Sequence, residues 1–271
     1  MTVESIDRAT ASPPRVAERA RRPLLDNRGL RVAGGALVLA LLAWRLGAGP
    51  FVDGLRATTW WAVLVALVLT AGTTWCVAAR WSVLSARFGR PVPLRTAYVS
   101  YYRSQLINAT VPGGVMGDVH RGARHGWRGV VWDRVLGQAV QVALVGALLL
   151  PGGWRWLGLA GVALAVGAGG RLLVLSVLST AGHLLIFLAA AESVGVSLSV
   201  GALVPVGALV LLGASVPLNV AGWGPREGAA AWAFAAYGST AAAGLAVSVT
   251  FGVLATLGTL PGLLVLGRRD D

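Results

Sequence analysis

Long runs of apolar residues recur along this 271-residue chain, and they limit its fold more than any other feature. Hydrophobic residues make up 56% of the sequence and charged residues only 13%, so the runs lack the polar face of a water-soluble helix. Within a bilayer, a backbone satisfies its N–H and C=O groups only as a helix or a closed barrel. No period-two alternation of apolar and polar residues indicates a barrel. We therefore expect an all-α, polytopic bundle of transmembrane helices.

The formal net charge of +12 comes entirely from arginine, since the chain has no lysine. These arginines lie beside the apolar runs, where they set orientation and contact anionic lipid headgroups. We therefore expect membrane lipids with anionic headgroups as partners, and no nucleic acid. The single cysteine, Cys76, excludes an internal disulfide and a cysteine metal cluster, and the histidines lack metal-ligand spacing. We expect no metal and no cofactor.

The distribution of arginine also predicts how the chain crosses the membrane. Residues 1–28 are expected to form a disordered basic cytoplasmic tail, residues 29–267 an integral membrane domain, and residues 268–271 a cytoplasmic C-terminus. Both termini then lie on the inner side of a cell inner (plasma) membrane. The cell is expected to be bacterial, because a composition with arginine as its only strong base and rich in Ala, Gly and Val is typical of a GC-rich bacterial genome. Six full spans are expected. Five lie at about 30–48, 59–79, 130–150, 172–191 and 239–266, and the remaining one begins after Trp154 and ends at about residue 169.

Two further segments, 96–112 and 200–228, are apolar but interrupted by proline and glycine. Full crossing by the first would place Arg121, Arg124 and Arg128 outside, against the positive-inside bias. We therefore expect both segments to be re-entrant hairpins. The alternative is an eight-span protein in which 96–112 and 200–216 cross fully. Between the second and third spans, residues 80–95 are expected to form a cytoplasmic elbow, and the loop after the first span carries Asp53 and Arg56.

The two interrupted segments contain an internal repeat. Residues 106–121 (LINATVPGGVMGDVHR) align with residues 211–226 (LLGASVPLNVAGWGPR), and the identical positions include both prolines and both arginines. Each arginine follows its proline by nine residues and has an acid nearby, Asp118 in the first copy and Glu227 in the second. If the hairpins enter from opposite faces, they form the inverted repeat that is common among secondary transporters.

Ionisable residues in these broken segments are the candidate site, because charge within a membrane is costly and should face a cavity and pair. Arginine binds phosphate through two hydrogen bonds, so Arg121 and Arg226 are expected to hold a phosphate, with Asp118 and Glu227 pairing with them. The alternative is a structural set of ion pairs that holds the hairpins closed. The candidate substrate-binding residues are Asn108, Pro112, Gly113, Gly114, Gly117, Asp118, Arg121, Asp133, Arg134, Pro217, Gly222, Gly224, Arg226 and Glu227.

Three ordered motifs carry a family resemblance. They are Asn108-x3-Pro112-Gly113-Gly114-x2-Gly117-Asp118-x2-Arg121, Asp133-Arg134-x2-Gly137, and Pro217-x4-Gly222-x-Gly224-x-Arg226-Glu227, with Arg80-Trp81-x2-Leu84 upstream. Over about residues 60–266 the chain resembles the lysylphosphatidylglycerol synthase transmembrane family, a flippase-like family. It departs from that pattern at Met116, where the family commonly has glycine. The resemblance implies the lipid-translocating half alone, as a stand-alone member without the soluble aminoacyltransferase domain.

The expected function is to bind and translocate a phosphate-bearing lipid, such as a phospholipid or a polyprenyl-linked lipid. No ATP-binding motif is visible, so movement is expected to be passive or ion-coupled. One alternative is a membrane-embedded lipid or glycosyl transferase that uses Asp118 or Glu227 as a base. Another is a non-transporting subunit of a complex with a lipid-modifying enzyme as partner. A protein that only binds and translocates lipid is expected to have no enzymatic activity.

Overall fold

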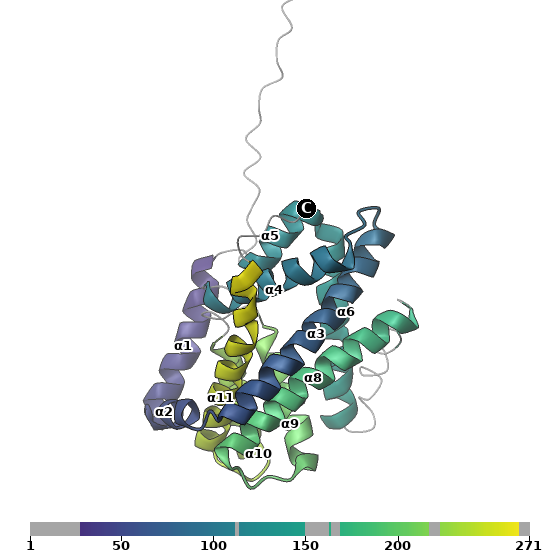
Figure 1. Cartoon of the computed structure of the whole chain (residues 1–271). Helices are drawn as coiled ribbons and strands as arrows, with labels where there is room; N and C mark the ends of the chain where they lie inside the picture. Colours follow the sequence, from purple (N-terminus) through teal and green to yellow (C-terminus); the bar gives the residue numbers. More distant parts are fainter. Residues whose placement is uncertain (1–27, 112–113, 150–162, 164–168, 217–222, 266–271) are drawn as a thin grey trace, which may run out of the picture.

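The computed structural model describes residues 28–111, 114–149, 163, 169–216 and 223–265, and this part of the chain is built from helices (Figure 1). The expected all-α class is confirmed. The elements in chain order are α1 (Arg28–Leu46), α2 (Gly49–Arg56), α3 (Trp60–Arg87), α4 (Leu94–Thr110), α5 (Met116–His125), α6 (Trp127–Leu149), α8 (Gly170–Val194), α9 (Val200–Ala214), α10 (Pro225–Ala236), α11 (Ala241–Thr259) and the 3-10 helix η3 (Leu260–Val265).

Three helices are long and apolar enough to cross a membrane, namely α3, α8 and the continuous pair α11–η3. They confirm the spans expected at 59–79, 172–191 and 239–266, so the protein is a multi-pass membrane protein. The span expected at about 130–150 overlaps α6, which is not among these three helices. The span expected to end near residue 169, the tail before residue 28 and the C-terminal arginines fall outside the described residues. The total number of spans stays a prediction.

The first apolar run differs from its expected form. Residues 49–56, expected as a loop with Asp53 and Arg56, form the helix α2, which meets the Ala36–Leu46 part of α1 at an angle of 101°. Proline near its N-terminus favours the start of this helix, because proline is pre-organised for the first helical turn. The Thr250 hydroxyl of α11 donates a hydrogen bond of 2.7 Å to the Gly54 carbonyl oxygen. Together α1 and α2 can form a fourth, bent span.

The long helices pack around an apolar core, with α11 in contact with α2, α3, α8 and α10. Small residues allow this close approach: a Cβ at position 244 would overlap the Ala230 carbonyl of α10. Elsewhere, apolar side chains such as Leu64, Val68 and Leu178 point outward, as expected where lipid replaces water as the solvent. The core includes Ala62, Ala66, Phe187, Val206, Phe234 and Phe251.

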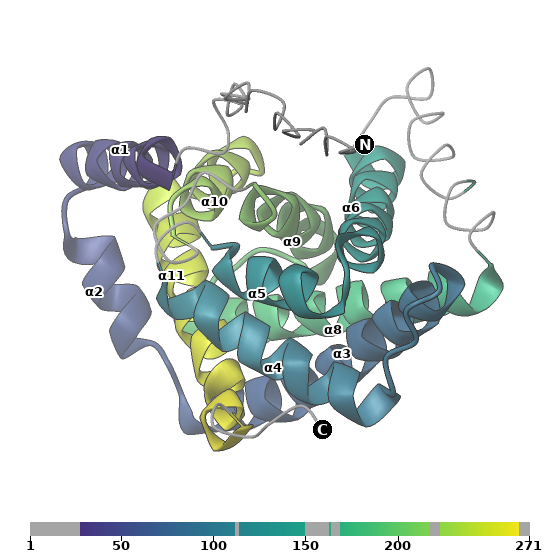
Figure 2. The ribbon, with the colours of Figure 1, turned by 90° about the horizontal axis from the view of Figure 1, so that it is seen from above.

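The two repeat copies lie in different parts of the bundle. Figure 1 shows α4 and α5, which flank the first break, at the upper end of the molecule, whereas α9 and α10, which flank the second, lie in its lower half. Each helix pair is in direct contact. Seen from above in Figure 2, α4 runs lengthwise across the end of the bundle. The chain thus turns back on itself after α4, and the inverted relation of the two copies stays a prediction.

Candidate functional site

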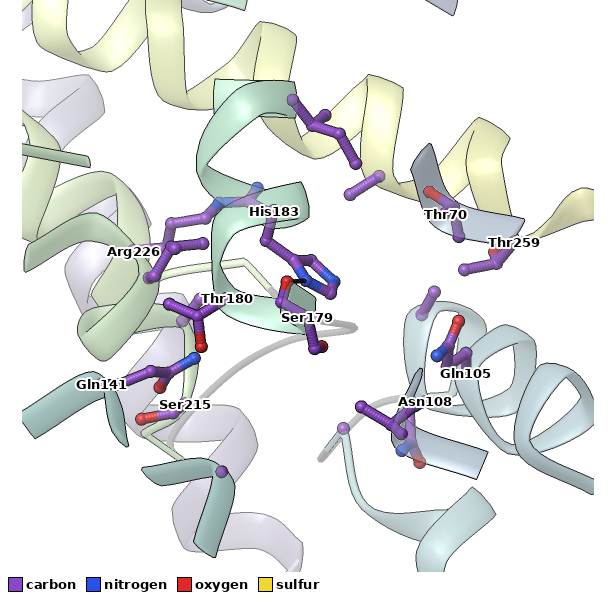
Figure 3. A pocket seen from close by; sticks show the side chains of 18 of the residues that line it. Thr70, Gln105, Asn108, Gln141, Ser179, Thr180, His183, Ser215, Arg226 and Thr259 are labelled. Atoms are coloured by element: carbon purple, nitrogen blue, oxygen red, sulfur yellow. Dashed lines mark hydrogen bonds between the residues drawn. The ribbon is translucent and has the colours of Figure 1, made fainter. Parts of the chain in front are cut away.

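A cavity of about 350 Å³ lies between α3, α4, α6, α8, α9, α10 and α11 (Figure 3). Both copies of the internal repeat contribute to its wall. The first copy contributes Asn108, Ala109 and Gly114, and the second contributes Leu211, Ala214, Ser215, Trp223 and Arg226. Segments about a hundred residues apart in the sequence therefore border one space.

A buried ion pair between α3 and α6 forms one side of this cavity. The Arg80 Nε donates to Asp133 Oδ1 at 2.7 Å, and Asp133 is fully buried. The Tyr101 hydroxyl of α4 donates to the second carboxylate oxygen of Asp133. Arg80 Nη1 also donates to the Ser176 hydroxyl of α8 at 2.9 Å. One carboxylate and one guanidinium thus connect four helices.

The position of Arg80 corrects the sequence expectation, which placed it in a cytoplasmic elbow. Nothing in residues 80–87 breaks a helix, so α3 continues to Arg87, and Arg80 lies within it with 4% of its surface exposed. Its buried charge is tolerated because Asp133 lies opposite. Of the expected elbow, only the stretch between α3 and α4 is non-helical.

Arg121 of α5 is enclosed beside this ion pair. Its Nη2 atom lies 2.8 Å from Asp118 Oδ1 and 3.8 Å from Asp133 Oδ2. Its guanidinium lies over two aromatic rings, 3.8 Å from the Tyr101 centroid and 4.6 Å from the Trp81 centroid, which is cation–π geometry. Only 1% of its surface is exposed, and it is not among the residues that line the cavity.

Asp118 joins Arg121 to the cavity wall. It forms a second ion pair with Arg134 of α6, which lines the cavity and keeps 49% of its side chain exposed. Burial would raise the pKa of Asp118, but Arg134 and Arg121 outweigh burial and hold that pKa below its usual range. Asp118 is therefore ionised. Three arginines, including Arg80, here surround two carboxylates, so this cluster carries an excess positive charge.

Asn108 closes the hairpin around this cluster. Its Oδ1 accepts a hydrogen bond of 2.8 Å from the Gly117 N–H, and its Nδ2 donates to Asp118 at 3.4 Å. The Ser104 hydroxyl donates to the Gly117 carbonyl at 2.9 Å. A Cβ at position 117 would overlap the Ser104 backbone, so this contact between α4 and α5 requires glycine.

The second copy forms a smaller cluster on α10. Arg226 donates from Nε at 2.8 Å and from Nη2 at 2.6 Å to Glu227 Oε1. The fully buried Glu227 also accepts from the Gly224 N–H at 2.7 Å and from the Ser248 hydroxyl at 3.2 Å. A Cβ at position 252 would overlap the Arg226 guanidinium, so Gly252 of α11 leaves the space that this group occupies.

Neutral polar side chains complete the cavity wall in two stripes that the sequence interpretation missed. On α8 they are Ser176, Ser179, Thr180 and His183, and on α6 Gln138 and Gln141 follow Arg134. Figure 3 shows Gln141, Thr180 and Ser215 on one side of the cavity and Gln105 with Asn108 on another. The spacings i, i+3, i+4 and i+7 on α8 put its four residues on one face. Such a polar face on an otherwise apolar span is the sequence signal for a cavity wall.

The fourteen predicted site residues divide into three groups. Those lining the cavity are Asn108, Gly114, Asp133, Arg134 and Arg226. Those behind it, in contact with lining residues or beside them in the chain, are Gly117, Asp118, Arg121, Gly224 and Glu227. Pro112, Gly113, Pro217 and Gly222 lie outside the described residues. Among the described residues, no cluster of three or more His, Cys, Asp or Glu side chains could hold a metal ion.

A comparison with known families identifies the family of this chain. The model of the lysylphosphatidylglycerol synthase transmembrane (TM) region matches residues 29–178, which is more than half of the chain. The protein therefore belongs to this family. The matched region includes the whole α3–α6 cluster around Asp133, whereas Arg226 and its cluster follow it. No curated protein and no solved structure matches the chain.

Proposed function

We propose that this member of the lysylphosphatidylglycerol synthase transmembrane family binds a phosphate-bearing lipid headgroup in the cavity and translocates the lipid across the membrane. The family relates the chain to lipid handling. The observation that carries the proposal is the placement of Arg226, a buried cationic residue that lines a cavity inside a membrane bundle.

Arg226 retains hydrogen-bonding capacity toward the cavity. Its Nε and Nη2 atoms bind Glu227, while Nη1 makes no hydrogen bond with a described residue. Arg134 on the α6 side is half-exposed, and its orientation is set by Asp118, which Arg121 in turn holds. We infer that a phosphate in the cavity accepts hydrogen bonds from Arg226 and Arg134, which would balance the excess positive charge. In this proposal Arg226 and Arg134 contact the lipid, and Arg121 is a positioning residue.

The outer surface of the bundle suits the rest of a lipid. Apolar side chains point outward from α3 and α8, the two helices that contribute Thr70 and Ser179 to the polar cavity. A headgroup can thus occupy a polar interior while its acyl chains stay in the surrounding lipid, which avoids exposing charge to hydrocarbon.

The same geometry weighs against a transferase. A catalytic base must reach the proton that it removes. Asp118 and Glu227, the candidate bases, both lie behind the lining residues and already accept hydrogen bonds from arginines. Asp133 lines the cavity, but its two oxygens are occupied by Arg80 and Tyr101.

Purified protein in liposomes provides the test. Fluorescent phosphatidylglycerol in the inner leaflet should become accessible to a membrane-impermeant quencher, and its mass should stay unchanged. Arg226→Ala should lower the rate at least tenfold. Arg171→Ala is the matched control, because Arg171 is exposed and does not line the cavity. A wild-type rate equal to that of protein-free liposomes would contradict translocation, and a change in lipid mass would indicate the transferase.

A further inference from the structure

We infer that the headgroup held in this cavity is uncharged and rich in hydroxyl groups, as in a sugar or polyol joined through phosphate, and that cationic headgroups are rejected. The inference rests on the proposed function and specifies its substrate class. It follows from one juxtaposition: neutral hydroxyl and amide side chains of α6 and α8 share the cavity with Arg134 and Arg226.

The neutral side chains have hydrogen-bonding capacity left for a ligand. The Ser179 and Thr180 hydroxyls make no hydrogen bond with a described residue, and the buried Oε1 atom of Gln141 has no donor. A buried polar atom without a partner is unfavourable, so such groups are normally bound to something. A hydroxyl group can both donate and accept, which lets one polyol satisfy the Gln141 carbonyl and a neighbouring hydroxyl together.

The charges of the cavity oppose a cation. Its lining residues include Arg80, Arg134 and Arg226 but only one carboxylate, Asp133, among the residues that the structure describes. Both oxygens of Asp133 are already bound. An ammonium group would therefore face arginines with no free carboxylate, and like charges repel strongly in a low-dielectric interior. A phosphate followed by a neutral polyol meets no such repulsion.

The size of the cavity agrees with a headgroup. About 350 Å³ lies at the lower end of the volumes typical of small-molecule sites. A volume of this order suits a phosphate with a compact polyol. The chemistry of the site selects the headgroup, and the lipid chains remain outside the cavity.

Three lipids with identical acyl chains test the inference by native mass spectrometry of the purified protein. Phosphatidylinositol has a phosphate and a neutral polyol, phosphatidylethanolamine has a phosphate and an ammonium group, and phosphatidic acid has the phosphate alone. We expect phosphatidylinositol to bind at least tenfold more tightly than phosphatidylethanolamine, and more tightly than phosphatidic acid. If phosphatidylethanolamine binds as tightly as phosphatidylinositol, this inference is overturned but the proposed function is not. Binding of none of the three would overturn the proposed function as well.

A double variant separates headgroup recognition from general damage. Ser179→Ala with Thr180→Val should weaken phosphatidylinositol binding about tenfold, the effect of losing one or two neutral hydrogen bonds, and leave phosphatidic acid binding unchanged. Ser193→Ala is the control, since Ser193 lies on the same helix α8 outside the cavity wall. An equal loss for both lipids would contradict polyol recognition. Soluble inositol 1-phosphate should not displace the bound lipid at equal concentration, and displacement would indicate a soluble ligand instead.

Discussion

Arg121 and Arg226 occupy matching positions in the two repeat copies, yet their surroundings differ. Arg121 is held between two aromatic rings and two carboxylates, with 1% of its surface exposed, and does not reach the cavity. Arg226 is also buried, with 7% of its surface exposed, and lies over the Trp223 and Phe251 rings, but it has one carboxylate partner, Glu227, and it lines the cavity. A shared motif therefore does not imply a shared role, because neighbours from other helices decide whether an arginine is enclosed or available.

Apart from Asp118, the neighbours that enclose Arg121 come from outside the repeat. Trp81 lies on α3 and Asp133 on α6, and both are buried. At Arg226, the aromatic neighbours are Trp223 and Phe251, and Gly252 on α11 leaves the space that the guanidinium occupies. We interpret the Arg80, Asp133 and Arg121 part of the first cluster as the rigid support of the site, and Arg226 of the second cluster, with Arg134, as its contact with the ligand. The following substitutions test that division.

The largest effect is expected from Asp133→Ala. Its removal leaves two buried guanidinium groups, Arg80 and Arg121, without their shared carboxylate. Breaking a buried ion pair on one side destabilises a protein by about 3–5 kcal/mol, and we expect the upper part of that range. SDS-induced unfolding followed by tryptophan fluorescence measures the change. Asp53→Ala, at an exposed position of α2, serves as control and should change stability by less than about 0.5 kcal/mol. Equal effects of the two substitutions would refute the supporting role of the first cluster.

Substitution of Arg121 should mainly lower the stability of the protein, whereas substitution of Arg226 should mainly lower its transport rate. Arg121→Ala is expected to lower the unfolding free energy by about 3 kcal/mol, as for a broken buried ion pair, and to leave measurable transport per folded molecule. Arg226→Ala should lower the transport rate at least tenfold even where the protein remains folded. Arg226→Lys should restore only part of the rate, because an ammonium cannot reproduce the planar guanidinium contact. If Arg121→Ala abolishes transport in fully stable protein, Arg121 contacts the ligand directly and the division fails.

Gly252→Ala tests the second cluster without altering any charge. The added methyl group would occupy the place of the Arg226 guanidinium, the mobile end of a long side chain, so we expect the side chain to move and the fold to persist. Liposome transport should fall about tenfold, the effect of about 1.4 kcal/mol. Gly72→Ala on α3 is the matched control, because a Cβ there meets nothing within 4 Å. Unchanged transport in Gly252→Ala would show that the position of this guanidinium does not matter.

Cysteine labelling, which should perturb the protein least, tests whether the two copies enter from opposite faces. Arginine distribution predicts that His125 faces the cytoplasm and that residue 196 lies outside. In a Cys76→Ala background, an impermeant thiol reagent added to intact cells should label His125→Cys poorly and Val196→Cys well. Permeabilised cells provide the control for reactivity. The reverse pattern would contradict the inverted arrangement.

Much of the helical framework could be predicted from the sequence, because apolar length and composition are local properties. The spans matching α3, α8 and α11 are examples. The pairs Arg121–Asp118 and Arg226–Glu227 were also predictable, since their members are three and one residues apart and share a helix. In contrast, the helix α2 was missed, since its contact with Thr250 joins residues far apart in the chain.

The candidate site was also only partly predictable from the sequence, because its key contacts join residues far apart in the chain. The sequence identified Asp133, but its partner Arg80 lies 53 residues earlier, and nothing in the local pattern connects the two. The polar face of α8 was visible as Ser176, Ser179, Thr180 and His183 at helical spacing, although its importance depends on the helices opposite it. Long-range pairing of buried polar groups is decided by helix packing, which a single sequence does not reveal.

By itself, the sequence determined that this protein is a helical membrane protein of the lysylphosphatidylglycerol synthase transmembrane family with two glycine- and proline-broken segments. Those properties follow from residue type and short-range order. Only the tertiary structure decided that Arg121 is enclosed, that Arg226 and Arg134 border one cavity, and that neutral hydroxyl and amide groups share it. The physical reason is that the environment of a buried charge depends on the side chains that other helices bring within a few ångströms.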